Sequence, residues 1–131
     1  MWGLGVTGIP QQHGLLLRRA WHAQGVQHSQ CDALSTPPTS QTANTFPYPG
    51  TTPSVSTNLG SNAIVWAIEN NNPAVLHADD ATNLSNELYN SNQAGSRDLF
   101  GPGNKFITPV VANGKVFVGT PTGIAEFGLL P

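Results

Sequence analysis

The sequence predicts an all-β fold made of short antiparallel strands. Its polar residues are mainly Asn, Thr, Ser and Gln, accompanied by 14 Gly and 11 Pro, a balance that suits short strands joined by many turns. From Ser54 onward, short β-branched or aromatic runs alternate with turn residues. The dipeptide Asn113-Gly114 between two such runs is typical of a type I′ hairpin, which needs positive φ at both central residues.

Charge and composition exclude several functional classes. The 131 residues hold five Lys and Arg against seven Asp and Glu, a net charge of -2, so we expect neither nucleic acid nor a membrane surface as a partner. Cys31 is the only cysteine, and no intrachain disulfide can form. Leu15-Leu16-Leu17 is too short for a membrane span or a signal-peptide core, so we expect no signal peptide in this chain, and its localisation stays open.

The N-terminal segment, residues 1–34, shows no clear hydrophobic period, and we expect it to be irregular and without strands. One hypothesis is that it is an out-of-frame translation. With permitted codons, a one-base shift from Gln11 onward gives Asn-Asn-Thr-Val-Tyr-Tyr-Tyr-Gly-Ala and later Leu-Lys-Ala-Phe-Ser-Ile, which would make two strands. The pair His28 and Cys31 has a zinc-ligand spacing without the second pair of a usual site, so we interpret it as accidental composition.

Residues 35–53 are rich in Pro, Thr and Ser, and their prolines exclude helix and interrupt strand pairing, which predicts an extended connector. Beyond it, the connections Asn58 to Asn62, Asn70 to Pro73 and Asn113-Gly114 separate the expected strands. These strands are Ser54 to Thr57, Ala63 to Glu69, Ala74 to Ala78, Glu87 to Ser91, Thr108 to Ala112, Lys115 to Thr120 and Gly123 to Leu129.

The strand order repeats. A proline-led strand and an apolar strand begin at Pro53 and Ala63, and again at Pro109 and Lys115, and a third strand follows each time. The period is about 55 residues, the excess over a usual repeat lying in the Asn92 to Phe106 loop. Such a period indicates stacked repeats.

One stretch resembles the PQQ-like propeller repeat, whose motif is Ala-x-Asp-x-x-Thr-Gly-x-x-x-Trp. The matching residues are Ala78, Asp80, Thr82, Asn83 in the glycine place and Tyr89 in the tryptophan place. The resemblance implies that Asp80 and Thr82 cap a turn, that Asn83 takes the left-handed backbone of the glycine, and that the aromatic residue wedges between blades. Residues 108–128 are similar to the closing repeat of this family, and the resemblance covers roughly residues 35–131.

The resemblance implies a partial β-propeller at residues 54–131, about one and a half to two blades with at most three strands in the last. So few blades cannot close a ring, so we expect a fragment whose partners are the missing blades or other copies, through open strand edges. The parent protein would be secreted or extracytoplasmic.

Three functional hypotheses stay open. The first is a non-catalytic binding or structural scaffold, for which no cofactor and no catalytic or metal residue is expected here. The second is a remnant of a quinoprotein dehydrogenase that held PQQ and calcium, although the adjacent cysteine pair of those enzymes is absent. The third is a small adhesion or assembly module that pairs through open edges.

Other polar and aromatic residues have plain structural readings. We expect His77 to be packed or hydrogen-bonded on its strand, Asp80 to cap a turn, and Gly101 to Lys105 to form a turn. Asp79, Asp80 and Asp98 are too few for a dedicated calcium loop. Trp66 is expected in the core between blades, with an aromatic platform for a sugar or quinone as the alternative.

Overall fold

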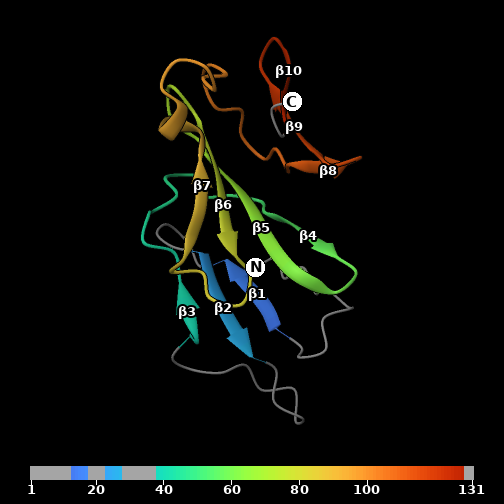
Figure 1. Ribbon diagram of the computed structural model, residues 1–131. Helices are drawn as coiled ribbons and strands as arrows, with labels where there is room; N and C mark the ends of the chain where they lie inside the picture. Colours follow the sequence, from blue (N-terminus) through green and yellow to red (C-terminus); the bar gives the residue numbers. More distant parts are fainter. Residues whose placement is uncertain (1–12, 18–22, 28–37, 129–131) are drawn as a thin grey trace.

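The computed structural model describes residues 13–17, 23–27 and 38–128 of the chain, and in them all regular structure except one short 3₁₀ turn is β-strand (Figure 1). The strands form three antiparallel sheets, each in sequence order. The N-terminal sheet holds β1 (His13–Leu17), β2 (Ala23–Gln27) and β3 (Ser40–Gln41). The middle sheet holds β4 (Ser54–Asn58), β5 (Ser61–Glu69), β6 (Val75–Asp80) and β7 (Glu87–Asn90). The C-terminal sheet holds β8 (Val110–Ala112), β9 (Lys115–Thr120) and β10 (Gly123–Phe127). The predicted all-β class is confirmed.

The strands from Ser54 onward lie where the sequence predicts them, with shifts of at most two residues at their ends. Asn113 and Gly114 have φ values of 51° and 73°, and Ala112 pairs with Lys115 across them. The predicted tight hairpin is therefore confirmed, since both central residues take the positive φ of a type I′ turn.

The expectation of an irregular, strand-free N-terminal segment is wrong for residues 13–17 and 23–27. β1 and β2 pair along their full length, and β2 also pairs with β3 through Gln24 and Gly25. Local sequence did not reveal these strands because their pairing partners, not a period in the segment, decide them. The sequence also predicts one and a half to two repeats of strands, whereas the described residues form three sheets. The reading-frame hypothesis concerns the DNA and stays a prediction.

The tract at residues 35–53 is more than an extended connector, because its described part from residue 38 packs against its neighbours. Thr42 is buried, and its Oγ1 accepts a hydrogen bond from the Ala23 amide at 3.1 Å while its own amide donates to the Ala23 carbonyl at 3.0 Å. The buried Thr51 accepts from the Ile68 amide at 3.0 Å, and Phe46 is 3% exposed. The two buried threonine hydroxyls thus accept hydrogen bonds from backbone amides of β2 and β5, because the prolines of the tract prevent it from pairing with them as a regular strand.

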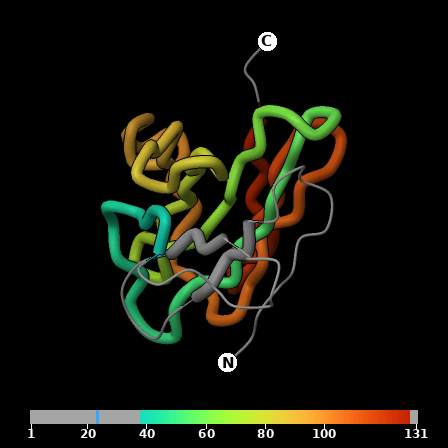
Figure 2. The backbone as a smooth tube through the Cα atoms, turned by 90° about the horizontal axis from the view of Figure 1, so that it is seen from below, coloured from blue at the N-terminus to red at the C-terminus, as the bar shows by residue number. Residues whose placement is uncertain are grey.

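The middle sheet is covered on both faces. Its first face packs toward the tract and β2 in a cluster formed by Ala23, Phe46, Val65, Ala67 and Leu84. Its second face packs on the C-terminal sheet in a cluster formed by Ile68, Ala74, Leu76, Val116 and Val118. Figure 2 shows the orange and red strands of the C-terminal sheet running alongside the green trace of β4 and β5. The core therefore consists of two layers, one on each side of the middle sheet.

The middle and C-terminal sheets repeat each other residue by residue. The equivalent cross-strand pairs are Ser54–Trp66 and Val110–Phe117, then Val55–Val65 and Val111–Val116, then Glu69–Val75 and Thr120–Gly123. A buried proline, Pro53 or Pro109, precedes the first strand in both sheets. The repeat seen in the sequence is thus a repeat of strand register, and it extends to which residues share a face.

The long loop after β7 is anchored between the two sheets. It begins with a 3₁₀ turn at Ser91–Ala94, and the buried Ser91 hydroxyl accepts a hydrogen bond from the Leu76 amide at 3.2 Å. Further on, the Ala74 amide donates to the Gly101 carbonyl, and the Gly103 amide donates to the Asn71 carbonyl, both at 2.8 Å. The expected turn at Gly101 to Lys105 therefore also ties the loop to the β5–β6 connection.

Gly103 lies so close to this connection that only glycine fits, because an added Cβ would lie 2.8 Å from the Asn70 Cα atom. We predict that Gly103→Ala lowers the free energy of unfolding by about 1–3 kcal/mol through overpacking against backbone. Gly123→Ala is the matched control, since a Cβ there meets nothing within 4 Å and the backbone φ is not in the left-handed region. Urea melts of the two variants check this, and equal stability of both would contradict the close approach.

Candidate functional site

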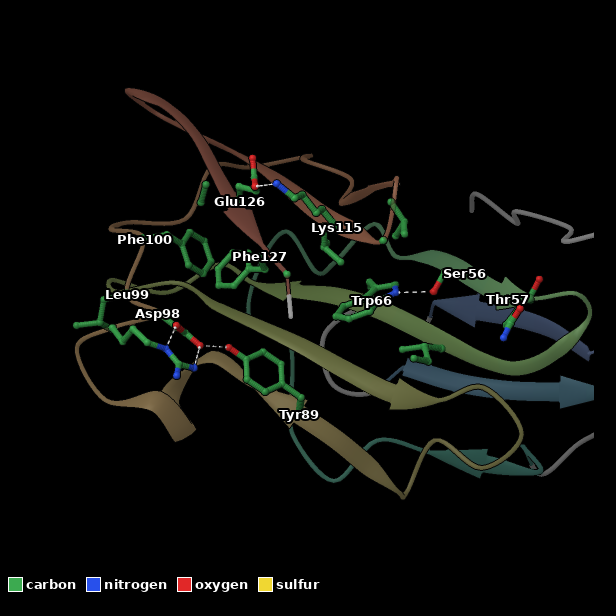
Figure 3. A pocket seen from close by; sticks show the side chains of 18 residues that line it. Ser56, Thr57, Trp66, Tyr89, Asp98, Leu99, Phe100, Lys115, Glu126 and Phe127 are labelled. Atoms are coloured by element: carbon green, nitrogen blue, oxygen red, sulfur yellow. Dashed lines mark hydrogen bonds and ion pairs between the residues drawn. The ribbon is translucent and has the colours of Figure 1, made fainter. Parts of the chain in front are cut away.

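A cleft of about 1160 Å³ lies where the middle sheet, the C-terminal sheet and the long loop meet (Figure 3). Its walls are mainly apolar and aromatic. Phe100 from the loop meets Phe127 of β10 edge to face, with ring centroids 5.5 Å apart, and the two lie together at one end of the view. Ile64, Trp66, Val111 and Val116 line the cleft from the two sheets. A concave, apolar site with few polar groups is the usual form of a ligand pocket.

Trp66 and Tyr89 reach this cleft because they share one face of the middle sheet. Trp66 pairs with Ala78, and Ala78 pairs with Tyr89, so the three side chains lie in one row across β5, β6 and β7. The indole Nε1 of Trp66 donates to the Ser56 hydroxyl at 2.8 Å, which satisfies its one polar atom. Trp66 is half-buried against the second core layer, so it belongs to the core and also forms part of the cleft wall.

Besides the ion pair of Lys115 and Glu126, the cleft contains a hydrogen-bonded group of Tyr89, Arg97 and Asp98. The Arg97 guanidinium donates to Asp98 through Nε at 2.6 Å and Nη2 at 2.9 Å, and the Tyr89 hydroxyl donates to the same carboxylate. Burial, and then the bond to Asp98, raises the pKa of Tyr89 to about 12. The bonds from Arg97 and Tyr89 lower the pKa of Asp98 to about 2. Asp98 is therefore held as an anion by its two partners.

The motif residues Asp80, Thr82 and Asn83 form the turn between β6 and β7. Asp80 Oδ1 accepts from the Thr82 amide at 2.8 Å and from its hydroxyl at 2.7 Å, and these bonds lower the pKa of Asp80. Asn83 Oδ1 accepts in the same way from the Ser85 amide at 3.2 Å. Both side chains thus stabilise the turn as acceptors. The expectation that Asn83 takes a left-handed backbone is wrong, since its φ is not positive.

A second polar group lies on the opposite face of the middle sheet, around His77. This imidazole is buried, with Nδ1 at 2.6 Å from Glu87 Oε1 and Nε2 at 3.2 Å from Glu69 Oε2. Phe46 meets the ring edge to face at 5.7 Å between centroids. Because both nitrogens face carboxylate oxygens, both can donate only when the ring is protonated. His77 is therefore a packed and paired residue, not an exposed base.

Asp79 lies on the same face as His77, two residues further along β6, and pairs in register with Glu87. It is 1% exposed, and its Oδ2 atom has no hydrogen-bond partner. Burial raises the pKa of Asp79 to about 6; the nearby His77 opposes this rise and Glu87 adds to it. A buried carboxylate with an unpaired oxygen costs free energy when it is ionised. This burial could not be predicted from the sequence, because neighbouring Asp79 and Asp80 look alike until the strand places them on opposite faces.

The structure does not bring the candidate calcium ligands together. Asp79 faces the tract side of the middle sheet, Asp80 caps the β6–β7 turn, and Asp98 is bound to Arg97. Within residues 13–17, 23–27 and 38–128 no group of three or more His, Cys, Asp or Glu side chains has the arrangement to hold a metal ion. The pair His28 and Cys31 lies outside the described residues. In the described part of the chain, no helix is long and apolar enough to cross a membrane.

The contact between Tyr89 and Asp98 can be measured with a double-mutant cycle. We predict that Tyr89→Phe and Asp98→Asn are non-additive in the free energy of unfolding, with a coupling of about 0.5–1.5 kcal/mol, since each removes the same hydrogen bond. Tyr89→Phe combined with Glu126→Gln serves as the control, because the exposed Glu126 is bonded to Lys115 instead. Additivity within both pairs would show that the bond contributes nothing.

Asp79 should make stability depend on pH. Because its folded-state pKa of about 6 exceeds the ordinary value of 3.8, its stabilising contribution is fully present below about pH 4 and is lost as the pH rises through about 6. Asp79→Asn removes this titration, so between pH 4 and pH 8 the variant should gain about 1–3 kcal/mol relative to the parent chain. Urea melts across this range test it; parallel pH profiles would contradict the burial of an ionisable Asp79.

Comparison of the chain with models of known protein families, with curated proteins and with solved structures finds no match. Both the cleft and the His77 group contain polar side chains that are already engaged with one another.

Proposed function

We propose that the chain is part of a PQQ-like β-propeller repeat protein and acts as a non-catalytic binding or structural scaffold. The observation that carries the proposal is the residue-by-residue repeat of the middle and C-terminal sheets, which stack face to face through an apolar layer. Consecutive sheets that contact only their neighbours are the basic unit of repeat proteins, and propellers arrange such sheets radially.

The chemistry of the cleft supports a binding role over a catalytic one. Its main polar groups, Arg97, Asp98 and the Tyr89 hydroxyl, are bonded to one another, and the Trp66 nitrogen is bonded to Ser56. What the cleft offers a ligand is aromatic and apolar surface from Trp66, Phe100 and Phe127. Such surface binds through burial and ring contacts and supplies no nucleophile or general base.

The alternative is that the chain is the remnant of a quinoprotein dehydrogenase holding PQQ and calcium. The side chains present do not fit this group well. Calcium requires six to eight oxygen ligands around one point, whereas Asp79, Asp80 and Asp98 lie in three different environments. The adjacent cysteine pair of the quinoproteins is also missing, since Cys31 is the only cysteine in the chain.

As partners we propose the missing blades of the parent or other copies of the chain, joined through open strand edges, which also keeps the assembly-module hypothesis open. Edge strands of the described sheets include β7, β8 and β10. For the parent protein we propose a secreted or extracytoplasmic location, on the resemblance to the repeat family alone.

A calorimetric titration with PQQ, with and without calcium, separates the scaffold from the dehydrogenase remnant. We predict no saturable heat in either case, because the described residues offer no calcium cage and the Arg97 guanidinium in the cleft is already bonded to Asp98. If binding does appear, the Trp66→Ala variant tests whether the cleft is the site of that binding. Saturable, calcium-dependent binding would overturn the scaffold proposal and favour the dehydrogenase remnant.

A further inference from the structure

The outer face of the C-terminal sheet, defined here by Val110, Lys115, Phe117, Ile124 and Glu126, is the face opposite to the second core layer, and two of its members, Lys115 and Glu126, also border the cleft. These residues alternate along β8, β9 and β10 with the inward-facing Val111, Val116, Val118, Ala125 and Phe127 of the second core layer. Ile124 is 75% exposed and Val110 is 57% exposed. A three-stranded sheet thus presents branched apolar side chains to solvent at positions where an antiparallel sheet with a wet face normally carries polar ones.

The chain itself contains a covered version of this face. In the register repeat, Val110, Phe117 and Ile124 are equivalent to Ser54, Trp66 and Leu76 of the middle sheet. That equivalent face is the one that packs on the C-terminal sheet, and Leu76 in it is 0% exposed. At two of these positions, Phe117 and Ile124, the outer face repeats the apolar residues with which the middle sheet holds another sheet, and no sheet covers them among the described residues.

The charged side chains of the outer face are compatible with a copy of the same chain. Lys115 and Glu126 form an ion pair with each other, at the positions of Ile64 and Ala78 in the middle sheet. The face therefore carries one cation and one anion and no net charge, so two copies can meet without burying charges of one sign. A partner of strong charge of either sign would gain nothing from it.

We propose that the outer face of the C-terminal sheet docks, sheet on sheet, against a second copy of this chain. The occupant is inferred from the repeat, since the equivalent face of the middle sheet is covered by another sheet of this chain, together with Phe100 and Ile107 of the long loop. This inference rests on the scaffold proposal and deepens it. It names a second copy as the partner, and it places the contact on the outer face of the C-terminal sheet instead of on the open strand edges. Packed sheets bury side chains from both inner faces in a layer about 10 Å thick, which would cover Ile124 and Val110.

Sedimentation equilibrium of the full chain over a wide concentration range tests the proposal. We expect concentration-dependent self-association that Ile124→Lys weakens about tenfold or more, because it places a cation in the centre of the apolar contact. Val110→Lys should do the same. Both residues are mostly exposed in the single chain, so neither variant should disturb the fold, and circular dichroism of each variant checks this.

Leu59→Lys is the matched control, because Leu59 is fully exposed, apolar and located in the β4–β5 turn, away from the outer face. A monomer at every concentration would overturn the docking proposal. It would not affect the scaffold proposal, which the PQQ titration tests separately. Equal association of the Ile124→Lys, Val110→Lys and Leu59→Lys variants would also overturn it, since association would then use another surface. Association lost in the first two variants alone would support it.

Discussion

The apolar contact between the middle and C-terminal sheets is the interaction on which the other features depend. Ile68, Leu76, Val116 and Val118 are each at most 4% exposed and meet in one layer. Full burial of a side chain of this size contributes about 1.5–3 kcal/mol, so the four together contribute about 6–12 kcal/mol, which is comparable with the net stability of a small domain, about 5–15 kcal/mol. The contact also fixes the distance between the sheets, and with it the width of the cleft beside them.

The long loop after β7 is placed by the same contact. Phe100 packs on Phe127, and the Ser91 hydroxyl holds the Leu76 amide, so the loop is joined to residues of both sheets. This positions Asp98 within reach of the Tyr89 hydroxyl and thereby assembles the polar side of the cleft. A loop of this length without regular strands is retained in a compact fold when it is anchored by its own contacts.

The two faces of the middle sheet have different chemistry. The face toward the C-terminal sheet is apolar, whereas the face toward residues 38–46 combines Val65 and Ala67 with His77, Asp79 and Glu87. Ionising the buried Asp79 costs free energy, which the neighbouring His77 only partly offsets. The apolar layer on the other face offsets this cost.

The sequence by itself determined the all-β class, the strands from Ser54 onward and the Asn113-Gly114 hairpin, because turn residues and β-branched runs act locally. It also indicated the turn-forming role of Asp80. Only the tertiary structure decided that β1, β2 and β3 form a sheet, that Asp79 is buried while Asp80 is not, and that Tyr89 meets Asp98. The reason is physical: these features depend on strand pairing, on which face another sheet covers and on where the long loop is anchored, and none of these is set by the residues next to them in sequence.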